Sequence, residues 1–214
     1  NRRKDNFVAQ LYEEDSEFPT ATTAVVFYDR GTGWHACYPK ATKSTEDTVE
    51  AMQNFQGHDP IHSFYSDNSK ELSAAAKFMH WKHPTATPGV PQTNGLGERA
   101  VRTVKEGGRC ELIQAGLHAS FWEDACPCFC FKKNTEGGQQ SAYFKRHGVE
   151  SNHLRIPFGT LVDFMPTPQP DNHDIGPFES KTIPGVFLGY HEQPGGKWSG
   201  DYWVAEFEPF RNDP

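Results

Sequence analysis

The sequence predicts an α/β fold, a mixed sheet flanked by helices, followed by a small all-β domain. Strand-like and helical segments alternate in the first part of the chain, which favours a sheet with helices on both faces. Past residue 150 the pattern changes to short apolar runs between Pro and Gly turns: 156–164, 183–190 and 200–207. We therefore expect an α/β domain over 1–135, a linker over 136–155 and a β domain over 156–214.

Three consecutive strands are expected at the start of the α/β domain. Residues 7–12 form a first apolar run, and 23–29 are rich in β-branched and aromatic side chains. Gly31 and Gly33 then provide a turn, and 34–39 form the return strand of a hairpin. The three strands should be antiparallel to one another.

Two helices and one more strand follow. Ser44 has the character of an N-cap, and its helix should extend to about Phe55 with apolar residues on one face. Residues 61–66 predict a short strand that ends at Asp67. The Ala-rich stretch 68–79 has the period of a second helix.

The second half of the α/β domain is predicted to be helical. A loop over 83–94 carries three prolines, and loops of that length inside a compact domain usually have a function. Helices are expected over 97–116 and 121–133, and a polar connection over 137–152. The apolar side of the first of these helices should consist of Ala100, Val101, Val104 and Leu112.

Composition narrows the class of protein. The formal net charge of −7 does not favour nucleic-acid binding, although a local cluster of bases can still bind DNA. No run approaches the ~18 apolar residues of a membrane span. The chain begins with Asn1, so we interpret it as a piece of something longer.

The cysteines suggest a reduced, intracellular protein. Their number, five, is odd, and Cys126, Cys128 and Cys130 alternate with other residues in a spacing that suits no common zinc site. Such a run could hold a soft metal ion. The alternative is that these thiols are buried packing groups, as free cysteines usually are.

Two acidic residues occupy positions where α/β proteins place their sites. Asp67 ends a predicted strand, Glu98 opens a predicted helix, and 30 residues lie between them. Paired carboxylates are hard ligands that suit Mg²⁺ or Mn²⁺, so we expect the two carboxylates within about 4–8 Å of each other. The alternative is that both are ordinary surface acids.

The helix that begins near Glu98 also carries a charged stripe. Arg102, Lys105 and Arg109 follow Glu98 at positions i+4, i+7 and i+11, which share one helix face. An acid could hold a metal ion while the bases contact a phosphate backbone. The same pattern also fits a solvated helix face with a Glu–Arg pair.

Two linked motifs give the chain a family resemblance. The segments Phe64-Tyr-Ser-Asp-Asn-Ser-Lys-Glu-Leu72 and Thr87-Pro-Gly-Val-Pro-Gln-Thr-Asn-Gly-Leu-Gly-Glu-Arg99 resemble the integrase core of copia-type LTR retrotransposons. In that family they supply the second and third acids of a DDE site, which would be Asp67 and Glu98. The tail 183–190 resembles the SH3-like domain that follows the core in these polyproteins.

The resemblance implies an RNase H-like fold, two divalent ions (Mg²⁺ or Mn²⁺) and DNA strand transfer after 3′-end processing. It implies DNA partners, the element end and the target, bound by an oligomer of the chain in the nucleus or in a cytoplasmic retroelement particle. The residues expected at DNA are Gln92, Asn94, Arg99, Arg102, Lys105 and Arg109. A plain RNase H-type nuclease is disfavoured by the 91–95 loop and the tail.

One departure from the family bears on activity. The first acid should lie in the first strand, and our alignment puts Gln10 there. Gln offers a neutral oxygen, a much poorer ligand for Mg²⁺ than a carboxylate. Asp5 or Asp15 could substitute if the strand is shifted. The alternative function is a non-catalytic DNA-binding remnant of an integrase.

Overall fold

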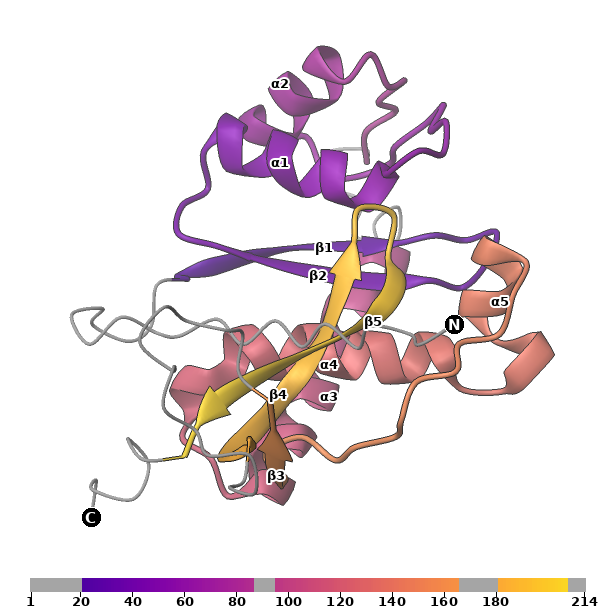
Figure 1. The fold of residues 1–214 in the computed structure, drawn as a ribbon. Coiled ribbons are helices and arrows are strands. Elements are labelled where there is room, and N and C mark those ends of the chain that lie inside the picture. Colours follow the sequence, from indigo (N-terminus) through magenta and orange to yellow (C-terminus); the bar gives the residue numbers. More distant parts are fainter. Residues whose placement is uncertain (1–20, 87–94, 166–180, 208–214) are drawn as a thin grey trace.

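The computed structural model describes residues 21–86, 95–165 and 181–207. In the described part, a two-stranded sheet lies between two groups of helices, α1 with α2 on one side and α3 with α4 on the other (Figure 1). This arrangement confirms the predicted mixed α/β class with helices on both faces of a sheet. The expected strand over 7–12 lies outside the described residues. Among the described helices, none has the length and apolar character needed to cross a bilayer.

The predicted hairpin is confirmed. Strand β1 (Thr23–Tyr28) pairs antiparallel with β2 (His35–Lys40), from Thr23 opposite Lys40 to Tyr28 opposite His35. The Asp29 carboxylate holds the turn, because its oxygens accept from the Gly31 N–H at 2.9 Å and the Thr32 hydroxyl at 2.6 Å. Asp29 therefore has a structural task in the turn.

Helices α1 and α2 form a lobe on one face of this sheet. Ser44 caps α1 (Thr45–Gln56), accepting from the Asp47 N–H at 3.0 Å, as its sequence predicted. Phe55 of α1 stacks on Phe27 of β1 with ring centroids 4.6 Å apart. Helix α2 (Lys70–Phe78) packs on α1, and its Ala-rich side is buried.

The predicted strand over 61–66 is wrong. The segment makes only two isolated parallel bridges, Ser63 with Lys82 and Ser66 with Thr85. Backbone hydrogen bonds run from the N–H of Lys82 to His62 and from that of Ala86 to Ser66. The next donor in this register would be residue 84, a proline without an N–H, so the ladder is interrupted between the two bridges.

Helices α3 (Gly95–Ala115) and α4 (Trp122–Thr135) cover the other face of the sheet. They pack closely because Gly107 leaves room for the Phe129 ring, and a Cβ at residue 107 would lie 2.3 Å from it. The buried Glu111 of α3 pairs with Lys132 of α4 at 2.8 Å. Val101, predicted on the apolar side of α3, is 41% exposed, because it lies about 100° around the helix from the buried Ala100.

The predicted polar connection over 137–152 contains helical turns. Helix α5 (Ala142–His147) is capped by Ser141, whose hydroxyl accepts from the Phe144 N–H at 3.0 Å, and Gly148 ends it at φ 70°. This Ser and Gly pair is a helix signal that the sequence interpretation missed. Short 3₁₀ turns precede α4 and α5: η2 (Ala119–Phe121) and η3 (Gly138–Gln140).

The C-terminal β region is confirmed as a small sheet. Its strands β3 (Leu161–Phe164), β4 (Ile183–Gln193) and β5 (Lys197–Glu206) are antiparallel in the order β3-β4-β5. Strand β4 packs on α4, and buried side chains such as Phe131 and Phe187 belong to one cluster. A separate SH3-like domain over 156–214, with a boundary near residue 150, stays a prediction.

The turn between β4 and β5 reaches the end of α1 (Figure 1). The Gly195 N–H donates to the Asn54 carbonyl at 2.7 Å, and a Cβ at Gly57 would lie 2.6 Å from the Gly195 backbone. Beside this contact, the guanidinium group of Arg146 in α5 stacks on two rings. Its central carbon lies 5.1 Å from the centroid of the Trp34 ring and 4.7 Å from that of the Phe55 ring. We call Gly57, Arg146, Glu192 and Gly195 the hairpin joint.

Candidate functional site

One open cleft of about 1470 Å³ contains most of the predicted site residues that the structure describes. Asp67 and Glu98 both line it, although they come from the segment before α2 and from the first turn of α3. The structure thus places these two carboxylates on one cleft, while their expected separation of about 4–8 Å stays a prediction. Gln92 and Asn94 lie outside the described residues.

The predicted charged stripe of α3 faces the same cleft. Its lining includes Arg102, Lys105 and Arg109, all of which are exposed on the helix. The helical period accounts for their common direction, because the steps of four, three and four residues return to one face. Arg99 is exposed but does not line the cleft, since it lies next to Glu98 and is rotated about 100° around the helix.

Asp67 lies where the bridged segment 61–66 meets α2. One of its carboxylate oxygens accepts from the Ser69 N–H at 3.3 Å. The carboxylate is otherwise directed to the surface, since Asp67 is an exposed residue. Asp67 lines the cleft directly after this segment, although the segment is not a regular strand.

The sequence interpretation missed a histidine beside Asp67. The His83 Nε2 atom lies 2.7 Å from the Ser66 hydroxyl, which donates to the Asp67 carbonyl at 2.8 Å. The Ser66 hydroxyl has a single proton, which it donates to Asp67. In the hydrogen bond between His83 and Ser66, the Nε2 atom must therefore be the donor. Burial lowers the pKa of His83 below its usual value, against the opposing effect of the Asp67 charge.

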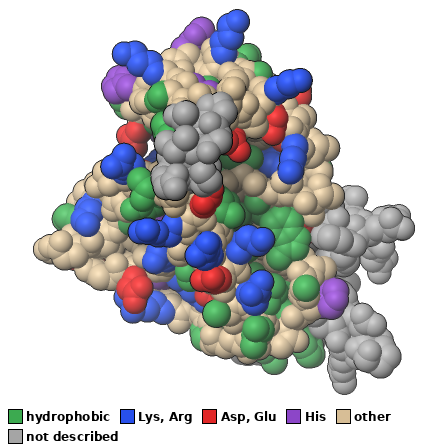
Figure 2. All heavy atoms as spheres, turned by 180° about the vertical axis from the view of Figure 1, so that it is seen from behind, with side chains coloured by type: hydrophobic (Ala, Val, Ile, Leu, Met, Phe, Trp, Pro, Cys, Tyr) green, Lys and Arg blue, Asp and Glu red, His purple; other side chains and the backbone are tan. Residues whose placement is uncertain are grey.

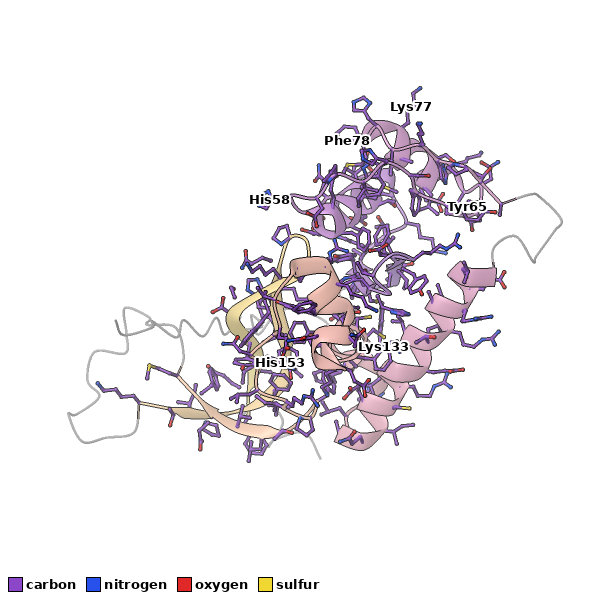
Figure 3. All side chains as sticks on the ribbon, turned by 90° about the vertical axis from the view of Figure 1, so that its right-hand side faces the viewer. His58, Tyr65, Lys77, Phe78, Lys133 and His153 are labelled. Atoms are coloured by element: carbon purple, nitrogen blue, oxygen red, sulfur yellow. The ribbon has the colours of Figure 1, made fainter. Side chains whose placement is uncertain are left out.

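Further bases and several aromatic residues, the exposed Tyr65 among them, line the cleft beyond the predicted set. Figure 2, the view from behind, shows several Lys and Arg side chains close together with acids among them. Tyr65 is 49% exposed at the edge of the α1–α2 lobe nearest the start of α3, whereas Lys77 and Phe78 lie at the far end of that lobe (Figure 3). The additional bases on the cleft are Arg30, Lys43, Lys145 and Arg146.

The described residues provide some of the ligands that a divalent cation would need. Asp67 and Glu98 offer carboxylate oxygens on one cleft, the ligand type that Mg²⁺ and Mn²⁺ prefer. Within residues 21–86, 95–165 and 181–207, no group of three or more His, Cys, Asp or Glu side chains lies together in a metal-binding arrangement. Gln10, at the position that the resemblance assigns to the first acid, lies outside these ranges.

The described part of the chain is a mixed α/β fold with one open cleft lined by both acidic and basic residues, an arrangement that suits a phosphate-containing ligand. No protein-family model matches the chain. The chain is 31% identical over 134 residues to the retrovirus-related Pol polyprotein from transposon TNT 1-94 of Nicotiana tabacum, covering 60% of this chain and 10% of that protein. It is 30% identical over 182 residues to the retrovirus-related Pol polyprotein from transposon RE1 of Arabidopsis thaliana, covering 78% of this chain and 12% of that protein.

The homologues of this chain are therefore retrovirus-related Pol polyproteins of plant transposons, consistent with the copia-type integrase core that the motifs predicted. The chain spans about a tenth of the length of these relatives.

Solved structures with a similar arrangement are retroviral integrases. The catalytic core domain of HTLV-2 integrase, solved with magnesium in a trimeric form, has a TM-score of 0.45 and 18% identity, covering 58% of this chain and 84% of that one. The BIV integrase core has a TM-score of 0.42 and 18% identity, covering 59% and 88%. A simian T-cell lymphotropic virus intasome with a PP2A subunit has a TM-score of 0.46 and 15% identity, covering 85% and 76%.

Proposed function

We propose that the chain is the core of a retrotransposon integrase, the type of enzyme that processes 3′ ends and transfers them to target DNA with a divalent metal, and that Gln10 in the position of the first acid leaves this chain with little or no joining activity. The observation that carries this proposal is the cleft that Asp67, Glu98 and the basic stripe of α3 line together. Homology to Pol polyproteins of plant transposons supports it. The proposed partners are the element end and target DNA, bound by an oligomer in the nucleus or in a cytoplasmic retroelement particle.

Each group on the cleft has a distinct part in the proposed reaction. Asp67 and Glu98 would hold Mg²⁺ or Mn²⁺, which when bound polarises a phosphodiester and stabilises the charge on its oxygens. Arg102, Lys105 and Arg109 would neutralise phosphates and fix the register of the DNA. Such contacts carry no sequence information, so this face alone would bind duplexes of different sequence alike.

A second function, a DNA-binding remnant without catalysis, is favoured by Gln10. Two Mg²⁺ ions would bring four positive charges, and the two carboxylates of Asp67 and Glu98 offset half of that. A carboxylate at position 10 would offset more of that charge, whereas the amide of Gln10 has no charge to contribute. This version keeps the basic face and the DNA partner while the chemistry is lost.

The test is a DNA-joining assay with a labelled duplex that has a recessed 3′ end, a plasmid target, and Mg²⁺ or Mn²⁺. We expect the unmodified chain to bind the duplex and to show little or no joining. Gln10→Asp should raise Mg²⁺-dependent joining, and adding Glu98→Gln to that variant should remove the gain. Gln10→Ala is the matched control and should change nothing.

Three other outcomes distinguish the alternatives. Joining by the unmodified chain that is abolished by Asp15→Asn would make Asp15 the first acid and our alignment wrong. DNA binding without joining in the Gln10→Asp variant would favour the remnant. Failure of every variant to bind the duplex would overturn both versions of the proposal.

A further inference from the structure

The alternating cysteines of α4 fall into two different environments. Cys126 and Cys130 are one helical turn apart, and both join Cys37 of β2 and Val104 of α3 in a buried cluster. Cys128 points the other way, into the main core, as expected for a residue about 200° around the helix from Cys126. The three thiols of α4 therefore do not act as one ligand set, and the candidate partner of α4 is the strand thiol of Cys37.

Cys37 of β2 and Cys126 of α4 lie in the same small buried cluster, so their thiols are neighbours across the strand–helix contact. Each thiol also shifts the pKa of the other, with a side-chain hydrogen bond as the largest cause for each. The Cys126 sulfur also packs against α3, since a Cβ built on Gly108 would lie 2.5 Å from it. The missing side chain at residue 108 therefore makes the space that this sulfur occupies, and the helix backbone keeps it beside its partner.

The two thiols differ in acidity. The hydrogen bond from Cys37 lowers the pKa of the Cys126 thiol, and the positive charge of Lys105 lowers it further, while burial opposes both effects. In Cys37 the same hydrogen bond and burial raise the pKa well above the usual range. Burial also raises the pKa of Cys128, to about 12. Cys126 is thus the thiol of α4 best able to react as a thiolate.

We propose that Cys37 and Cys126 form an oxidisable dithiol, a modification site in which a hydroperoxide converts the hydrogen-bonded pair into a disulfide between β2 and α4. The Cys126 thiolate attacks a peroxide oxygen, the O–O bond breaks, and a sulfenic acid forms with loss of hydroxide. The Cys37 sulfur then attacks the Cys126 sulfur, and water leaves. In sum, two thiols lose two electrons and two protons, and hydrogen peroxide is reduced to two waters.

The disulfide would fix the sheet to the helix layer behind the basic stripe of α3. A bond between residues so distant in sequence removes much of the freedom of the unfolded chain, so the oxidised form should be the more stable one. Formation of the bond requires neither bound DNA nor joining activity.

The test is oxidation of the full chain with hydrogen peroxide, followed by alkylation of the remaining thiols and mass spectrometry without reduction. We expect a Cys37–Cys126 link, located within the α4 peptide by fragmentation, together with a rise of several degrees in Tm that dithiothreitol reverses. The exposed Cys110 should remain open to alkylation when the peroxide is stoichiometric. Links from Cys37 to Cys128 or Cys130, or oxidation of Cys126 without a link, would overturn the proposal.

Matched variants remove any ambiguity within the α4 peptide. Cys126→Ala should abolish the link, whereas Cys130→Ala, one turn away in the same cluster, should retain it. A link that persists in Cys126→Ala would refute the assignment. If Cys126→Ala does not fold, the fragmentation spectrum of the unmodified chain still decides which sulfur is bonded.

Discussion

The cleft and the hairpin joint use charged residues in opposite ways. On the cleft, Glu98, Arg102 and Lys105 are exposed on one helix face. At the joint, Arg146 lies between the rings of Trp34 and Phe55 and donates to the Phe55 carbonyl. Burial there raises the pKa of Glu192 to about 8, against the attraction of the Arg146 charge.

Because of this difference, we expect DNA binding and the stability of the fold to depend on different residues. Exposed charges on a solvated helix face contribute little to folding and remain free to contact phosphates. Burying a charge costs desolvation free energy, so a change in the charge of a buried group changes the stability of the fold. Substitutions of Gly57 or Glu192 at the joint should therefore affect unfolding, and substitutions of the exposed bases on the cleft should affect DNA binding. Arg146 belongs to both regions and should affect both.

The largest effect is expected from Gly57→Ala. The new Cβ would lie 2.6 Å from the Gly195 backbone, and residue 57 has a φ of 58°, which side chains disfavour. Overpacking and strain together should lower the free energy of unfolding by about 3 kcal/mol, measured by urea denaturation.

Gly116→Ala is the matched control for Gly57→Ala. Residue 116 also has a positive φ, 67°, but a Cβ there would meet no atom within 4 Å. The control should cost about 1 kcal/mol, the conformational part alone. Equal losses in the two variants would mean that the contact of Gly57 with the hairpin adds nothing.

The next effect concerns Glu192 and pH. The folded chain holds the Glu192 proton up to about pH 8, whereas the unfolded chain releases it near its usual pKa of about 4.3. Between these values the folded state binds more protons, so this group's contribution to stability falls as pH rises and levels off above 8. Glu192→Gln should remove that fall and be more stable than the parent at pH 9, by on the order of 2 kcal/mol.

Urea denaturation from pH 5 to 9 measures the Glu192 effect as the difference between variant and parent. Glu150→Gln, a change of an exposed carboxylate, should follow the parent throughout. A constant difference between Glu192→Gln and the parent across this range would show that the Glu192 carboxyl does not titrate there.

The smallest effect on stability is expected from Arg102→Ala with Lys105→Ala. Since both side chains are exposed, the free energy of unfolding should change by no more than about 0.5 kcal/mol. Affinity for duplex DNA should fall roughly tenfold, and the slope of log affinity against log salt should flatten by about one for each phosphate that is no longer neutralised. Fluorescence anisotropy at several salt concentrations measures both quantities.

Lys77→Ala is the control for the basic stripe. It removes one positive charge from the far end of α2, away from the cleft (Figure 3). It should leave the affinity and the salt slope almost unchanged. A loss from Lys77→Ala of about half that of the double variant, in proportion to the charge removed, would indicate attraction by overall charge without a defined DNA-binding face.

The sequence by itself determined the features that neighbouring residues control. The Ser44 cap, the Gly turn after β1 and the period of α3 depend on contacts within a few positions, so each was predicted close to where it lies. The same period fixed the shared direction of Arg102, Lys105 and Arg109. Two sequence motifs identified Asp67 and Glu98 as the candidate acids.

Only the tertiary structure decided which distant segments meet. Pro84 cannot donate a backbone hydrogen bond, so it interrupts the pairing of 61–66 with 82–85. The sequence near Pro84 does not show this, because the missing bond matters only once the two segments lie side by side. The contacts of Gly57 with Gly195 and of Cys37 with Cys126 join segments that no local pattern relates. Local propensity acts through the backbone of adjacent residues, whereas these contacts depend on how whole elements pack, and packing follows from the shapes of all the side chains between them.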